Sequence, residues 1–482
     1  MKKEKILATM LAAVVTTSVC LSACKKAPNN GDLGYKIPDN AVQISLSDTQ
    51  IKAEDVVVDG NAEKGVYLAN DIVYYEAGKD FTYGEGTSDD AHTAKEAAEH
   101  TVLHIAKPGV YSISGTLSKG QIAVDLGEEA LNDPDAVVTL VLNGADITCE
   151  VAPAIIFYSV YECGDSDTAK ASKDVDTSLA GANLVIADGT ENTVNGGYVA
   201  KIYKPDTVVL NDSKTEVEDA KKLHKYDGAL YSKMSMNVYG EDKGNGVLKV
   251  NAQNEGIGSE LHLTINGGNI FVYSGNDGIN TNEDGVSVTT INGGNLTIQV
   301  TGETGEGDGI DSNGWLVING GNVTAQACAF SGDAGIDSDM GIHINGGTVI
   351  ASGHMLDKIE NGEQNYAVFY LSEKQNGGKS VSVKNAAGKT LLEACPANDY
   401  SILICSSPQL KNEEHTLWCG DVQLSEQGSQ NGQMPGKPGM QEMTPPDGVA
   451  PPDGARPNDG QIPPDGRPTG RPGDKPGKTP AI

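Results

Sequence analysis

Ile265-Asn266-Gly267-Gly268 is the first of four copies of one tetrapeptide in this chain of 482 residues. The other copies are Ile291–Gly294, Ile318–Gly321 and Ile344–Gly347, so the spacings are 26, 27 and 26 residues. A repeat of this length with strand-like residues around it is typical of a solenoid, in which each repeat forms one turn. Four independent β-hairpins with Asn-Gly turns are the alternative, but the regular spacing favours the solenoid.

An alternating run with the two-residue period of a β-strand follows each copy. In the first run Ile270 and Val272 are predicted to point inward, and Phe271 and Tyr273 outward. The later runs repeat this pattern, with inward Leu296, Ile298, Val323, Ala325, Val349 and Ala351, and outward Thr297, Gln299, Thr324, Gln326, Ile350 and Ser352. Asn and Gly tolerate the positive φ that a sharp corner needs. We therefore predict an all-β fold, a right-handed parallel β-helix with strands on three faces.

A second motif, Gly-Ile followed by Asp or Asn, accompanies three of the repeats, and a degenerate copy ends in Gly258. Aligning the copies on Gly-Ile places acidic and amide side chains in columns along the predicted stack. The candidate metal ligands from these columns are Asp277, Asn280, Asp308, Asp311, Asp333, Asp337 and Asp339.

Stacked carboxylates repel one another, because neighbouring turns lie only ~4.8 Å apart. At an effective dielectric of 20 the repulsion is ~3.5 kcal/mol per pair. No Lys or Arg occurs between Lys249 and Lys358 to offset it. Clustered hard oxygen ligands suit calcium, so we expect bound calcium. A solvated acidic face, with Asn and Asp serving turns, is the alternative.

The start of the chain has an apolar run that ends in Leu21-Ser22-Ala23-Cys24. It resembles a bacterial lipoprotein signal, which implies cleavage before Cys24, lipidation of Cys24 and a location on the extracellular face of the cytoplasmic membrane. An ordinary secretory signal is the alternative. The formal net charge of −31 makes nucleic acid a poor partner.

Changes in composition divide the chain into five predicted parts. These are a signal peptide at 1–23, a tether at 24–40, the β-helix domain at 41–355, a small β cap at 365–420, and a disordered Pro/Gly-rich tail at 425–482. Polar insertions are expected near 161–181 and 199–232, the second with a short helix near Glu216–Leu223.

Several motifs in order resemble the calcium-binding, carbohydrate-binding parallel β-helix lipoprotein family of clostridia. They are Gly115-Thr116-Leu117, Leu140–Ile147, Asp188–Thr193 and the repeats described above. The resemblance covers roughly residues 40–420 and implies a pectate-lyase-like fold that binds cellulose or acidic plant polysaccharide. The chain departs from the family in carrying fewer Gly-Ile-Asp turns.

Catalysis by a polyuronate lyase needs a base, commonly Arg or Lys in β-helix lyases. All three arginines, Arg456, Arg467 and Arg471, lie in the predicted tail. We therefore expect a non-catalytic adhesin, with no catalytic residues assigned. A calcium-dependent lyase or hydrolase is the first alternative, because the abundant acids allow a carboxylate pair, and a structural surface protein is the second. Trp315, expected to point outward, is the candidate sugar contact, or a structural surface aromatic.

Overall fold

The computed structural model describes residues 34–360 and 362–425. Nearly all of its regular elements are β-strands, which confirms the predicted all-β class. Within the described residues, no helix combines the length and the apolar character needed to cross a bilayer. The predicted signal peptide, Cys24, most of the tether and residues 426–482 of the predicted tail lie outside the described residues.

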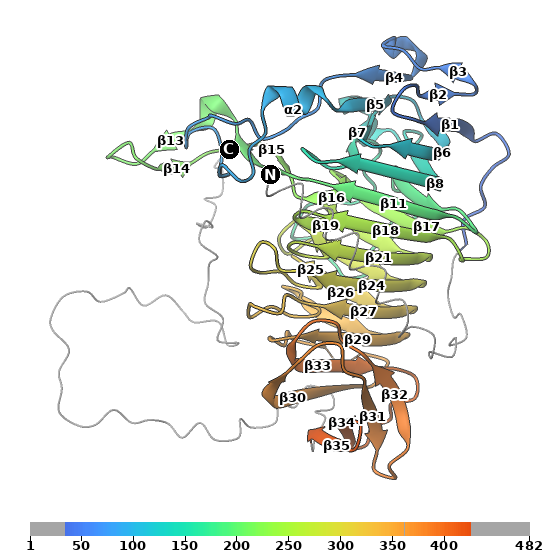
Figure 1. Ribbon diagram of the computed structural model, residues 1–482, viewed down its shortest axis with the longest axis vertical. Coiled ribbons are helices and arrows are strands. Elements are labelled where there is room, and N and C mark those ends of the chain that lie inside the picture. The colour runs from blue at the N-terminus through green and yellow to red at the C-terminus, as the bar shows by residue number, and fades with distance from the viewer. Residues whose placement is uncertain (1–33, 361, 426–482) are drawn as a thin grey trace. The chain divides into compact units, whose positions relative to one another are not determined.

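Three ladders of parallel strands build the repeats. The first contains the first half of β8 (Val138–Cys149), then β10 (Ala182–Ile186), β17 (Met236–Gly240), β20 (Leu263–Ile265), β23 (Val288–Ile291), β26 (Trp315–Ile318) and β28 (Gly341–Ile344). The second contains the end of β8, then β11 (Glu191–Gly196), β18 (Val247–Ala252), β21 (Asn269–Ser274), β24 (Asn295–Val300), β27 (Asn322–Gln326) and β29 (Thr348–Gly353). Figure 1 shows the second ladder stacked in chain order.

The third ladder carries the Gly-Ile motifs. It contains β5 (Thr101–Ile105), β7 (Gly120–Asp125), β9 (Ile155–Ser159), β16 (Gly228–Ser232), β19 (Glu255–Ser259), β22 (Ile279–Thr281) and β25 (Ile310–Ser312). The two strands that flank each Ile-Asn-Gly-Gly copy therefore belong to different ladders, and the hairpin alternative is wrong. The parallel stacking expected from the spacing is present, but no sheet among the described residues closes on itself, so the right-handed parallel β-helix stays a prediction.

Asparagine and glycine have different structural roles in the Ile-Asn-Gly-Gly corners. The second glycine of each copy has positive φ, from 81° to 95°. No asparagine in the described part of the chain has positive φ, so that half of the prediction was wrong. The asparagines instead form a ladder of side-chain amides, in which Nδ2 of Asn292 donates to Oδ1 of Asn266 (2.9 Å) and Nδ2 of Asn319 donates to Oδ1 of Asn292 (2.9 Å). Asn345 extends it by a further bond of 2.8 Å.

The predicted inward positions form the core between the ladders. All eight inward residues, from Ile270 to Ala351, are at most 1% exposed. The outward prediction fails at Gln326 and Ser352, which are buried. The segment after the repeats covers them, and Oε1 of Gln326 accepts a hydrogen bond from the Ala397 amide.

The residues after the repeats form antiparallel strands. β30 (Tyr366–Gln375) pairs with β33 (Tyr400–Ser406), and β33 pairs with β29, so it covers the open edge of the last repeat. A four-stranded sheet follows, with β31 (Val381–Asn385), β32 (Thr390–Ala394), β34 (His415–Cys419) and β35 (Val422–Ser425). Before the repeats, β1 (Val42–Leu46) pairs in parallel with β6 (Gly109–Leu117) and β4 (Val66–Ala69) runs antiparallel to β5. The helix α2 (Ala94–Ala98) precedes β5, and the short β2 (Lys52–Ala53) and β3 (Val56–Val57) follow β1.

The region predicted as a second insertion is β-structure rather than helix. β12 (Val199–Tyr203) pairs with β15 (Lys222–Tyr226), and β13 (Val209–Leu210) with β14 (Val217–Asp219), so the helix expected near Glu216–Leu223 is absent from these described residues. Gly228–Ser232, the last part of the predicted insertion, is β16 in the third ladder. The apolar residues of this segment form a strand of the ladder. The irregular spacing of this region hides that strand in the sequence.

The corner glycines give a test of the stacking. At Gly294 (φ 83°) an added Cβ would lie 2.6 Å from the carbonyl oxygen of Gly268, whereas at Gly285 (φ 68°) it would meet nothing within 4 Å. The positive φ costs either alanine roughly 1–2 kcal/mol, and only Gly294→Ala also displaces a neighbouring turn. Gly294→Ala should therefore lower the urea midpoint of unfolding more than Gly285→Ala. Equal losses would contradict the close stacking of these corners.

Candidate functional site

The acidic side chains gather on the third ladder because its register aligns them. Ile257, Ile279, Ile310 and Ile336 are neighbours across successive strands. Two residues before these isoleucines stand Glu255, Asp277 and Asp308, and one residue after them stand Asn280, Asp311 and Asp337. All six side chains are buried. Two of the three columns predicted from the Gly-Ile alignment thus run along the third ladder, and they contact each other between Asn280 and Glu255.

Three of these carboxylates form one compact cluster. Ligand atoms of Asp308, Asp311 and Asp337 lie within 4.8 Å of one another, and all three residues are buried. Burial, together with the carboxylates of Asp277, Asp311 and Asp337, raises the pKa of Asp308 well above its usual value. The Ala334 amide opposes this rise by donating a hydrogen bond of 2.6 Å to Oδ1 of Asp308. The cluster therefore concentrates negative charge in a place where water does not solvate it.

Asp277 and Asn280 link this cluster to the preceding repeats. Oδ1 of Asp277 accepts the Asp308 amide (2.7 Å), and Nδ2 of Asn280 donates to Oε1 of Glu255 (3.0 Å). The other side-chain oxygens of Glu255 and Asn280, Oε2 and Oδ1, are buried without a hydrogen-bond partner among the described residues. Burial and the carboxylates of Asp227 and Asp277 raise the pKa of Glu255 well above its usual value. Further oxygen donors therefore continue the column beyond the three-carboxylate cluster.

Two predicted ligands lie apart from the three-carboxylate cluster. Asp333 is half-buried and accepts hydrogen bonds from the Gly307 amide (2.6 Å) and the Ser331 hydroxyl. Asp339 is exposed. Of the seven predicted ligands, the structure brings Asp308, Asp311 and Asp337 together, and places Asp277 and Asn280 next along the column.

Sequence reasoning missed two buried carboxylates. Asp227 precedes β16 and forms an ion pair of 2.8 Å with Lys225, which brings a cation to the start of the column. In the sequence, the Asp227-Gly228 pair before an apolar run could have identified this carboxylate, but the pair falls within the predicted insertion at 199–232. Oδ2 of Asp357 accepts the Ser338 amide (3.0 Å) at the other end. No repeat motif marks Asp357 in the sequence.

Trp315 is partly exposed at the start of β26, in agreement with its predicted outward side. In register it neighbours Val288, and Val288 neighbours the position of His262. His262 is buried, and its Nδ1 accepts a hydrogen bond of 3.1 Å from the Val288 amide. Burial lowers the pKa of His262 to about 4, so the ring is neutral and serves packing.

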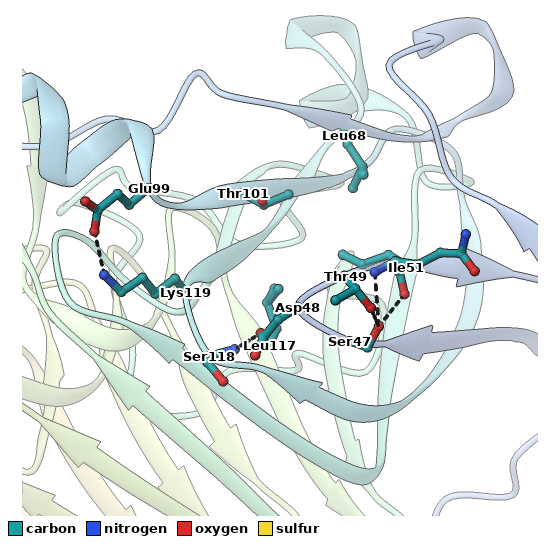
Figure 2. A pocket seen from close by; sticks show the side chains of 11 residues that line it. Ser47, Asp48, Thr49, Ile51, Leu68, Glu99, Thr101, Leu117, Ser118 and Lys119 are labelled. Carbon is teal, nitrogen blue, oxygen red and sulfur yellow. Dashed lines mark hydrogen bonds and ion pairs between the residues drawn. The ribbon is translucent and has the colours of Figure 1, made fainter.

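Two surface cavities are lined by residues other than those of the acidic column. One, of about 430 Å³, lies between the β1–β2 turn and β5 (Figure 2). Its polar groups bond one another: Lys119 pairs with Glu99 (2.6 Å), and Oδ1 of Asp48 accepts the Ser118 amide (2.6 Å). The other, of about 490 Å³, lies beside the ends of β8, β11 and β18.

Comparison with known proteins places the chain in a family. The model of the family described as "Carbohydrate-binding domain-containing protein" matches residues 99–393. A curated relative of the same description, from Acetivibrio thermocellus, is 34% identical over 172 residues. That alignment covers 35% of this chain and 44% of the relative, so the chain spans less than half of the relative's length.

A solved structure described as a polysaccharide lyase-like protein from C. thermocellum, in a gadolinium derivative, is also similar. Its sequence identity is 21% and its TM-score 0.36, over 67% of this chain and 96% of that one. The family match spans more than half of the residues, including all of the Ile-Asn-Gly-Gly repeats. The chain therefore belongs to the family of carbohydrate-binding domain-containing proteins.

Proposed function

We propose that this chain is a non-catalytic binder of plant-type polysaccharide, of the cellulose or polygalacturonate class, whose fold holds calcium. Membership of a carbohydrate-binding family supports polysaccharide as the partner. The calcium part rests on one observation above all, the buried cluster of Asp308, Asp311 and Asp337. We also infer that the three ladders wind as a right-handed parallel β-helix.

The donors in the cluster fit calcium. All three are carboxylates, which are the hard oxygen ligands that calcium prefers. Asp277, Asn280 and Glu255 offer further side-chain oxygens along the same column. A bound divalent cation would offset the repulsion between stacked carboxylates. In this proposal the metal stabilises the repeats and fixes their acidic face, while the polysaccharide binds on the surface.

The distribution of basic residues supports binding rather than lyase chemistry. The described residues contain no arginine, and Lys249 is the last lysine before a gap that ends at Lys358. Lys249 lies on β18 with its Nζ 3.4 Å from Oε2 of Glu191. Lys225, at the start of the acidic column, is paired with Asp227, so carboxylates already engage both lysines. A calcium-dependent lyase or hydrolase remains the alternative function, which the binding assay below tests directly.

Calcium should stabilise the fold, because a ligand that binds only the native state shifts the unfolding equilibrium. Chelation should lower the melting temperature of the wild type, and added calcium should restore it. Asp311→Ala should shrink this chelator-dependent shift. The matched control is Asp339→Asn, which changes an exposed acid in the same region and should keep the full shift. A wild-type melting temperature that is the same with and without chelator would contradict the calcium proposal.

Asp308 should give the metal-free protein a characteristic dependence on pH. Its folded pKa is raised above the ordinary value of 3.8, so the folded state holds a proton that the unfolded state releases. The associated stability is complete below the unfolded pKa and is lost as the pH rises toward the folded pKa. With chelator, raising the pH from about 4.5 to about 7.5 should lower Tm more in the wild type than in Asp308→Asn. Parallel melting profiles of the two proteins would argue against a buried, raised-pKa carboxyl.

The purified chain should be retained on insoluble plant polysaccharide without cutting it. We expect depletion from solution onto cellulose or gelled polygalacturonate, with no increase in reducing or unsaturated chain ends. A calcium-free gel of a polymer without sugar serves as the control for adsorption. New unsaturated uronide ends that disappear in Lys249→Ala would instead identify a lyase and a basic catalyst.

We further propose that Cys24 anchors the chain by a lipid to the outer face of the cytoplasmic membrane. The supporting feature is the Leu21–Cys24 signal, followed by Lys25 and Lys26, which suit an anionic head-group surface. Cys24→Ala should shed the protein to the medium or leave it unprocessed, as fractionation and mass measurement would reveal. Wild-type processing and membrane retention of this variant would rule out Cys24 as the anchor.

A further inference from the structure

The 490 Å³ cavity beside the second ladder has the size and the lining of a ligand site. Its volume lies within the range of small-molecule pockets. The floor comes from neighbouring strands, with Thr148 on β8, Asn195 on β11 and Asn251 on β18. The sides come from the segment at 87–90 and from the loop that carries Glu303. Ladder and loops thus border one open cavity whose lining combines apolar surface with several polar groups.

The floor of the cavity is a chain of fixed amides. Nδ2 of Asn195 donates to Oγ1 of Thr148 (2.9 Å), and Nδ2 of Asn251 donates to Oδ1 of Asn195 (2.7 Å). Each of these amide nitrogens has a second hydrogen to donate, and Oδ1 of Asn251 can accept. Amide groups held in this way pair with hydroxyl groups, which both donate and accept. The stacking of the strands therefore supplies a row of preorganised partners for a polyhydroxylated ligand.

One wall of the cavity presents an oriented aromatic ring. Tyr198 donates its hydroxyl to Oδ1 of Asp90, while Oδ2 of Asp90 accepts from the amide (2.6 Å) and the hydroxyl (2.9 Å) of Thr87. Asp90 thereby fixes the ring of Tyr198 against the cavity. Flat aromatic faces contact the C–H face of a sugar ring while the amides take its hydroxyls.

An exposed aromatic side chain continues the surface next to the cavity. Phe330 is 78% exposed, the most exposed large apolar side chain among the described residues. Its ring stands over Gly302, where an added Cβ would lie 3.2 Å from Cδ2 of Phe330. Gly302 directly precedes Glu303 of the cavity lining. An exposed ring beside a cavity is an interaction feature rather than part of the core.

The charges of the cavity select among sugars. Four lining residues carry carboxylates, namely Asp89, Asp90, Glu150 and Glu303, and none of the lining residues is Lys, Arg or His. Carboxylates that line a cavity repel the carboxylate groups of uronate units bound inside it. They accept hydrogen bonds from neutral sugar hydroxyls, and such charge-assisted bonds are strong. The cavity is therefore complementary to uncharged sugar units.

We propose that this cavity, together with the ring of Phe330, binds a run of neutral hexose units in the polysaccharide partner and disfavours uronate units. The assignment rests on the proposed polysaccharide-binding function and narrows its ligand to the neutral, cellulose-like class. Tyr198 and Phe330 contact sugar faces, while Asn251 and Glu303 bond sugar hydroxyls.

Titration calorimetry of the full chain with cellohexaose and with hexagalacturonate tests this site. Phe330→Ala should weaken cellohexaose binding about three- to tenfold, the effect of losing one aromatic contact. Glu303→Gln should weaken it about tenfold, because a charge-assisted hydrogen bond is lost. Two variants are matched controls: Glu306→Gln in the same loop, and Leu179→Ala with a side chain 66% exposed.

The outcomes separate the site from the general function. Weakened binding in Phe330→Ala and Glu303→Gln, with controls like the wild type, supports the site. If both variants bind cellohexaose as tightly as the wild type, the cavity is not the binding site, but polysaccharide binding by the chain stands. Binding of hexagalacturonate alone, tightened by Glu303→Gln as a negative charge is removed, overturns the neutral class. A wild type that binds neither oligosaccharide nor polymer overturns the proposed function and the site with it.

Discussion

The short separation of stacked strands is the constraint on which this structure depends. At ~4.8 Å, each side chain meets the equivalent side chain of the next repeat. For asparagine this is favourable, because one amide donates to the next, as in the ladder from Asn266 to Asn345. For aspartate it is costly, because like charges meet without water between them. The same geometry thus builds the corners and brings the carboxyl groups of Asp308, Asp311 and Asp337 together, which is the basis of the proposed cation site.

The regular part of the fold was predictable because local and repeating signals agree there. The inward positions from Ile270 to Ala351 follow from a two-residue period, and their burial confirms it. The positive φ of corner glycines such as Gly294 could be predicted from the motif. The role of asparagine could not, because asparagine suits both a residue with positive φ and a ladder of side-chain amides. The structure distinguishes the two, because the corner asparagines have no positive φ and their side-chain amides bond one another.

Predictions failed where distant segments meet. Gln326 is buried because the strands after the repeats fold back over it, and no local pattern announces that contact. Asp227 joins the acidic column through β16, and no Ile-Asn-Gly-Gly copy marks that strand in the sequence. Asp333 stands one residue out of alignment and bonds to Gly307 rather than to the cluster. The cavity unites residues from 87 to 304, a combination that appears only when the chain is folded.

The carboxylates of the acidic column and those of the cavity lie in different environments. The column buries carboxylates against one another, which a divalent cation can offset, whereas the cavity leaves its carboxylates at a surface where hydroxyl donors can reach them. A chain with net charge −31 would repel an acidic polymer over much of its surface. Neutral glycan at the cavity and metal in the column are therefore compatible on one molecule.

We propose that the buried cluster of Asp308, Asp311 and Asp337 is a cation site with a proton to release. Calorimetric titration of calcium into chelator-stripped protein, in two buffers of different ionisation enthalpy, measures both binding and proton release. We expect saturable binding with net release of protons near neutral pH, because the pKa of Asp308 is raised, and a smaller release in Asp308→Asn. Absence of saturable binding, or binding with no proton release and no change in Asp308→Asn, would contradict it.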